Sequence, residues 1–204
     1  MAQPLFSYGD AINPKEFTIC SLVLKPFSLG HYILLEQFDN PFLTDNANAA
    51  VEAESGIYQF ILCLWICGNT YEDNLVMFDD NDLLHRNIDA FCQHYLEEMK
   101  RDADWNIYAQ IFRFREYIAY FTDMPAFQVE HKSTSMPSGI DWKQNLFTIA
   151  KSEFGYTDTA ILNMPLKRLF YEWCSFAEKN GSIRVQNADE MIMLNALKDR
   201  RKQI

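Results

Sequence analysis

The sequence is poor in the residues that break helices. Its 204 residues include 7 glycines and 7 prolines, against 16 Phe, 10 Tyr and 4 Trp. So few breakers, together with few valines, favour helices over a β-sandwich or barrel. With 49% hydrophobic residues, the chain can bury a substantial core without disulfides. This length fits one domain, or one domain with a small appended subdomain.

Long apolar runs are also missing. The segment 57–67 is apolar at every position except Gln59. It is shorter than the roughly 20 residues that a membrane span needs, so we expect a buried helix and no membrane partner.

The sequence also lacks targeting and disulfide signals. Residues 1–4 do not start a signal-peptide pattern. The 5 cysteines are odd in number and lack regular spacing, which favours reduced thiols over a disulfide framework.

Positive charge is scarce in the middle of the chain. The net charge is −10, and residues 51–101 carry ten acidic and three basic side chains. Such a surface repels phosphate backbones, so we expect no nucleic-acid partner. The basic run 198–202 is typical of a helix C-terminus, where cations meet the negative end of the dipole.

Apolar side chains at helical spacing predict most of the elements. We expect helices over residues 28–38, 51–67, 83–100, 104–121 and 141–154, and a final helix after Asn187. Ser28 and Asp141 are candidate N-caps. Residues 17–24 are expected to form a short strand or a first helical turn. The acidic segment 70–82 is expected to be a solvated connection, with or without one helical turn.

The C-terminal third contains the clearest helix signal. Asn163 is a candidate N-cap, Pro165 fits the first turn, and Gly181 fits a left-handed exit. One face carries Leu166, Leu169, Phe170, Trp173, Phe176 and Ala177. We expect Phe170 and Trp173 to be core residues of this portion.

A long stretch without helical period divides these patterns. Residues 123–139 contain two prolines and the run Lys132-Ser133-Thr134-Ser135. The sequence therefore predicts an all-α protein with an N-terminal helical, bundle-like domain (1–124), a linker (125–140) and a helical C-terminal portion (141–204).

Catalytic and cofactor motifs are absent. The sequence has no GxSxG elbow, phosphate-binding glycine loop or HExxH. His85, Cys92 and His94 share one predicted helix, but their spacings do not fit zinc ligands, which usually sit three or four residues apart there. Cys63 and Cys67 are expected in the core. We expect no catalytic residue, metal or cofactor; a cryptic metal- or cysteine-dependent enzyme is the remaining alternative.

Aromatic residues cover more than one face of the helix predicted at 104–121. An exposed apolar surface of this kind marks a partner site. The candidate partner-binding residues are Trp105, Tyr108, Phe112, Tyr117 and Tyr120. The alternative is an ordinary helix that is buried on all sides.

Two segments resemble proteins of tailed phages and prophages. The first runs from Pro26 to Glu36 and continues with Asn40-Pro41-Phe42; the second comprises Phe154-Gly155-Tyr156, 161–166 and Leu169-Phe170. The pattern is similar to tail assembly chaperones, which are small acidic helical proteins that keep the tape-measure protein soluble. The resemblance implies no catalytic residue and a protein acting in the host-cell cytoplasm.

The expected function is therefore protein binding without catalysis. The leading hypothesis is a tail assembly chaperone that receives amphipathic helices of a tape-measure client in apolar grooves. The alternative is a structural virion component, such as a tail-completion or connector protein. The sequence does not predict the oligomeric state.

Overall fold

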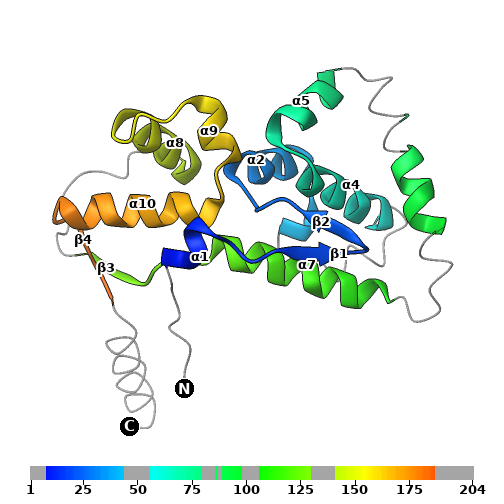
Figure 1. Ribbon diagram of the computed structural model, residues 1–204, viewed down its shortest axis with the longest axis horizontal. Coiled ribbons are helices and arrows are strands. Elements are labelled where there is room, and N and C mark those ends of the chain that lie inside the picture. Colours follow the sequence, from blue (N-terminus) through cyan, green and yellow to red (C-terminus); the bar gives the residue numbers. More distant parts are fainter. Residues whose placement is uncertain are drawn as a thin grey trace, which may run out of the picture. The chain divides into compact units, whose positions relative to one another are not determined.

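The structure is a computed structural model that describes residues 8–43, 56–79, 86, 89–97, 106–129 and 141–186. These residues are mainly helical, as expected, and also form two small antiparallel sheets of two strands each (Figure 1). A strictly all-α fold is therefore wrong, although a mainly helical one is confirmed. No helix in the described ranges is both long and apolar enough to cross a membrane.

The elements follow one another in this order: α1 (Tyr8–Ile12), β1 (Phe17–Ile19), β2 (Leu22–Leu24), α2 (Leu29–Gln37), the 3-10 turn η1 (Pro41–Leu43), α4 (Gly56–Gly68), α5 (Tyr71–Asp79), α7 (Ile107–Thr122), β3 (Phe127–Val129), α8 (Trp142–Ser152), α9 (Asp158–Asn163), α10 (Leu166–Lys179) and β4 (Ile183–Val185). Residues 89–97 are also helical. The expected final helix after Asn187 lies outside the described residues.

The chain forms two compact units that share its length unevenly. Unit 2 comprises residues 15–122 and 157–166, and unit 1 comprises residues 1–14, 123–156 and 167–204. Each unit thus takes a segment from the far side of the linker expected at 125–140. Whether the predicted N-terminal and C-terminal portions fold independently stays a prediction.

Unit 2 begins with a tight β-hairpin. Strands β1 and β2 pair antiparallel, with Ile19 opposite Leu22, so only Cys20 and Ser21 form the loop. Both loop residues have positive φ, 49° and 62°. Two-residue hairpins require this left-handed backbone, which usually selects Asn-Gly. Of the two possibilities left open at 17–24, the extended one is correct, but the segment forms two strands rather than one.

The start of α2 is fixed by a reciprocal pair of hydrogen bonds. The His31 backbone N–H donates to Ser28 Oγ, and the Ser28 backbone N–H donates to His31 Nδ1, both at 3.2 Å. This is the capping-box arrangement, with histidine in the place usually taken by Glu or Gln. The predicted N-cap is therefore confirmed. His31 Nε2 also lies 2.8 Å from the Asn69 carbonyl, which ties α2 to the end of α4.

Aromatic rings form much of the core of unit 2. The Tyr117 ring of α7 lies 5.3–5.7 Å from the rings of Phe17, Phe27, Phe114 and Phe121. Helix α4 adds Cys63 and Cys67, which are fully buried as expected. Edge-to-face and tilted ring pairs at these separations contribute beyond their buried area.

A late segment of the chain completes unit 2. The Leu166 N–H donates to the Phe27 carbonyl (2.8 Å), and Asn163 Oδ1 accepts from the Tyr71 N–H at the start of α5 (2.9 Å). Asn163 is therefore the last residue of α9 and caps α5, so its predicted role as N-cap of the next helix is wrong. A Cβ at Gly30 would come within 2.7 Å of the Leu162 carbonyl oxygen and 2.5 Å of the Tyr71 ring, so only glycine fits there.

The acidic segment expected to be a connection contains helix α5. The Thr70 hydroxyl and Asp73 form reciprocal hydrogen bonds at its start, with Thr70 Oγ1 accepting from the Asp73 N–H at 3.2 Å. Asn74 is the buried residue of the helix and donates to the Ile66 carbonyl at 2.9 Å. The helix is thus held by polar contacts rather than by an apolar stripe, which is why helical periodicity did not predict it.

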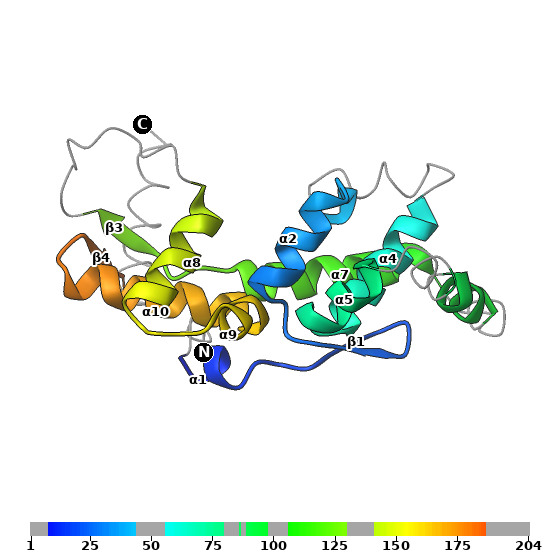
Figure 2. The ribbon, with the colours of Figure 1, turned by 90° about the horizontal axis from the view of Figure 1, so that it is seen from above.

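Unit 1 is built on α10. Helix α8 lies beside it (Figure 2), with Trp142 against Phe170 and Phe154 against Phe176 at ring separations of 5.9 and 6.1 Å. Helix α10 ends at Lys179, and the φ of +67° at Gly181 just after it confirms the predicted left-handed exit. The chain then forms β4, which pairs antiparallel with β3.

Lowering the pH should destabilise the fold through His31. Nδ1 of His31 accepts from the Ser28 N–H, so the proton of the neutral ring is on Nε2. Burial lowers the pKa of His31 from 6.5 to about 4, so the folded chain holds it neutral. Below about pH 6.5 the unfolded chain binds a proton that the folded chain does not, so the free energy of unfolding should fall by up to about 3 kcal/mol by pH 4.

The measurement is urea unfolding at several pH values between about 7 and 4.5. A His31→Gln variant should be less stable at neutral pH and should lack this part of the pH dependence. His94 is exposed, so His94→Gln serves as the control and should keep the dependence of the original chain. Equal pH slopes for the His31→Gln variant and the original chain would contradict the assignment.

Candidate apolar binding pocket

The structure places an apolar pocket between α8 and α10 of unit 1. Its volume is about 370 Å³, within the range of sites that bind small molecules or side chains of a partner. The lining residues are Met124, Trp142, Asn145, Leu146, Phe170 and Trp173. Asn145 is the single polar residue among them.

Helix geometry explains why these side chains converge. Asp141 caps α8 by accepting from the Lys143 N–H (3.2 Å), so the helix begins at Trp142. Trp142, Asn145 and Leu146 then lie on one face because they are three and four residues apart. Phe170 and Trp173 are likewise one turn apart on α10. Trp173 is also held by Phe127 of β3, at a ring separation of 5.6 Å.

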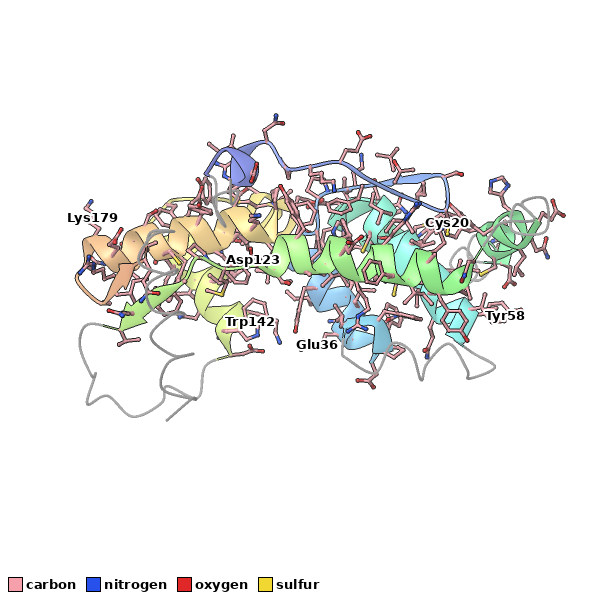
Figure 3. All side chains as sticks on the ribbon, turned by 90° about the horizontal axis from the view of Figure 1, so that it is seen from below. Cys20, Glu36, Tyr58, Asp123, Trp142 and Lys179 are labelled. Carbon is pink, nitrogen blue, oxygen red and sulfur yellow. The ribbon has the colours of Figure 1, made fainter. Side chains whose placement is uncertain are left out.

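The mouth of the pocket is accessible to solvent. Trp142 is 40% exposed and Met124 is 36% exposed, whereas Leu146 and Phe170 are buried. Figure 3 labels Trp142 at the start of α8. Trp and Met are typical of surfaces that bind partners, since Trp contributes a large contact area and Met adapts its shape.

Charged groups lie beside the pocket rather than within it. Asp141 and Lys143 form an ion pair at the start of α8, and the Lys143 ammonium lies 5.6 Å from the Trp142 ring centre. Hydrogen bonding to Lys143 lowers the pKa of Asp141. Partial burial raises the pKa of Asp123, next to Met124 in the chain, although Lys167 opposes this shift. The pocket is therefore lined by apolar groups and has a mixed-charge edge.

The lining residues include no acid, base or nucleophile. Burial raises the pKa of the Cys63, Cys67 and Cys92 thiols, and raises that of Cys174 to about 12. A reactive cysteine requires a lowered pKa and access to solvent, so these four thiols are not activated nucleophiles.

The described residues hold no group of three or more His, Cys, Asp and Glu side chains that could bind a metal ion. Of the three ligands considered on the helix predicted at 83–100, Cys92 is buried, His94 is exposed and His85 lies outside the described residues. The expected absence of metal stays a prediction.

The partner-binding residues expected on α7 are dispersed. Tyr108 and Phe112 are exposed, Phe112 by 62%, and Tyr120 is half-buried, with its hydroxyl accepting from the Lys15 N–H at 3.2 Å. Trp105 lies outside the described residues. Tyr108 and Phe112 therefore stay candidate contact residues.

Tyr117 is a correction to that set, because its side chain is fully buried. It lies three residues after Phe114 and four before Phe121, so all three face the same side of α7. Its hydroxyl donates to the Lys25 carbonyl at 2.7 Å. Burial, followed by the nearby Cys67, raises its pKa well above the ordinary value. Tyr117 is thus a core residue.

Sequence patterns did not reveal the pocket. They assigned Trp173 to the core, whereas Trp173 is half-buried and Trp142 is exposed. The available signal was the pair of tryptophans on two neighbouring amphipathic helices. Periodicity predicts which face of each helix is apolar, but it does not predict whether two such faces meet completely.

Comparison with known proteins gives no match to a protein-family model, to a characterised protein or to a solved structure.

Removing the Tyr117 hydroxyl should weaken unit 2 without unfolding it. Tyr117→Phe keeps the ring contacts but loses the hydrogen bond to Lys25, which should cost about 1 kcal/mol. Denaturant unfolding measures this loss. Phe112→Leu, on the exposed side of the same helix, is the control and should change stability by less than about 0.5 kcal/mol. A loss at Phe112 as large as that at Tyr117 would show that the two faces of α7 are misassigned.

A charge at the mouth of the pocket should prevent apolar ligands from binding. We expect Trp142→Asp to weaken binding of the dye anilinonaphthalene sulfonate at least about tenfold, or 1.4 kcal/mol, because a carboxylate in an apolar site is poorly solvated. Gln144→Asp adds the same charge to the same helical turn, about 200° away around an ideal helix, and should leave binding unchanged. Fluorescence titration distinguishes the two variants; equal losses would argue against the pocket as the dye site.

Proposed function

We propose that this chain is a non-enzymatic protein-binding protein whose unit 1 pocket receives large apolar side chains from a helical segment of its partner. The observation that carries the proposal is the pocket itself, an open apolar cavity of about 370 Å³ with two tryptophans and no titratable lining residue. Amphipathic helices bind apolar grooves by inserting side chains three and four residues apart.

The geometry of the lining favours binding over catalysis. General acid–base or nucleophilic chemistry requires a titratable group within hydrogen-bond distance of the reacting atoms. Asn145 is the one polar side chain at the pocket, and its amide can orient a ligand but cannot exchange a proton at neutral pH. Met124 and Trp142 at the mouth provide contact area for a partner.

The finer proposal is a tail assembly chaperone that keeps a tape-measure protein soluble. Its support is the resemblance to proteins of tailed phages, which comprises residues 26–36, 40–42, 154–156, 161–166 and 169–170. Two parts of that pattern form α2 and α9, which pack on each other in unit 2. Gly30 lies against the Leu162 carbonyl, and the Leu166 N–H donates a hydrogen bond to the Phe27 carbonyl. Most of the resembling residues build unit 2, whereas Phe154-Gly155-Tyr156 and Leu169-Phe170 belong to unit 1, where Phe170 lines the pocket. The net charge of −10 would help to keep a bound client soluble.

Co-expression with the tape-measure protein encoded in the same genome tests this proposal. The soluble fraction of the tape-measure protein should rise several-fold with the original chain and with Gln144→Asp, but not with Trp142→Asp. An unchanged fraction with all three would refute the chaperone role. Mass spectrometry of finished particles distinguishes the chaperone from the alternative, a structural virion component. A virion component would be present in the particles, and a chaperone would not.

A further inference from the structure

A second apolar surface lies in unit 2, and the charges around it differ from those at the pocket. It consists of Phe38 at the end of α2 and Leu75, Val76 and Phe78 of α5; these four residues are called the α5 patch. Val76 is 67% exposed, and Leu75 and Phe38 are 43% and 41% exposed. The rings of Phe38 and Phe78 lie 5.1 Å apart, so Phe38 lies beside α5. Val76 lies about 200° from Phe78 around an ideal helix, and Leu75 lies between them.

The exposure of α5 is unusual for a helix within a compact unit. Helices normally bury their large apolar residues on one stripe. In α5 the buried residue is Asn74, while Leu75 and Val76 reach solvent. The helix is secured through its polar residues, because Asn74 donates to Ile66 and Asn163 caps its start. Its apolar side chains are thus available to a partner.

Acidic residues surround the α5 patch. Glu72 precedes Leu75 and Val76 by three and four residues, and Asp79 follows them by four and three, so both acids lie one turn away on the same face. Glu36 and Asp39 flank Phe38, and Figure 3 labels Glu36 on α2. Between Lys25 and Arg86 the sequence contains no Lys or Arg at all.

This charge pattern selects the kind of partner. A second copy of the chain would place acids against acids, which costs energy at a symmetric interface. Asn163 Nδ2 already donates to Glu72 Oε2, so a partner with cationic side chains beside its apolar face would instead pair with Asp79 and Asp39 while covering Leu75 and Val76. We propose that the α5 patch is a docking surface for a basic amphipathic helix of another protein. This proposal does not depend on the unit 1 pocket.

A designed peptide provides a direct test. The probe is a helical peptide of about 18 residues, long enough to form a stable amphipathic face, with leucines on one face and lysines elsewhere. A second peptide with glutamates in place of the lysines has the same apolar face. The lysine peptide should bind the full chain at least tenfold more tightly, and its affinity should fall as salt rises.

Matched variants locate the binding surface. Val76→Asp should weaken binding of the lysine peptide at least tenfold, because it places a carboxylate in the apolar contact. Val23→Asp makes the same substitution at an exposed residue of β2 and should leave affinity unchanged or slightly raised by its negative charge. Attraction between net charges alone would affect both variants alike, and that result would overturn the proposal.

Two further measurements complete the test. Asp79→Lys should lower affinity and flatten its salt dependence, whereas the equivalent change at exposed Glu16 should not. Circular dichroism should show unchanged helix content in each variant.

Sedimentation should show the same oligomeric state for the original chain and for Val76→Asp. Dissociation of a dimer by Val76→Asp would mean that a second copy of the chain occupies the patch. Trp142→Asp should leave peptide binding intact, which separates this surface from the pocket.

Discussion

Unit 2 depends on the close packing of α2, α5 and α9 at one point. Gly30 lies so near the Leu162 carbonyl and the Tyr71 ring that any side chain there would collide with backbone. The same point holds the start of α5, since Asn163 accepts from the Tyr71 N–H. Because α5 buries little apolar surface, this contact and the bond from Asn74 to Ile66 largely determine its position. The α5 patch is exposed as a direct result.

Local signals predicted much of the fold. Ser28 and Asp141 each cap the helix that follows them, and Gly181, just after α10, has a left-handed conformation. These features depend on residues a few positions apart, so sequence patterns contain them. Asn163 was misassigned because its hydrogen-bond partner is 92 residues away. Helix α5 was missed for a different reason: the reciprocal Thr70–Asp73 pair at its start is local, but no buried apolar stripe follows it.

The candidate site was less predictable than the fold. Patterns correctly identified apolar faces on α8 and α10, but a pocket arises only where two such faces fail to fill the space between them. Tyr117 shows the opposite error. It was counted among the aromatic residues beyond one buried face, yet it lies in the core, where the Lys25 carbonyl accepts from its hydroxyl. Burial of a tyrosine therefore depends on whether a distant acceptor exists, which a sequence pattern does not contain.

The contribution of residues 157–166 to unit 2 also has a consequence for its biosynthesis. At ribosomal rates of about 5–20 residues per second, this segment is made roughly 2–9 s after α7 is complete. During that interval the Phe27 carbonyl and the Tyr71 N–H lack the partners that Leu166 and Asn163 later provide. The nascent chain must therefore hold the α2–α5 face open while residues 123–156 of unit 1 are synthesised. Closure of unit 2 is a late event in translation, although most of its residues are made first.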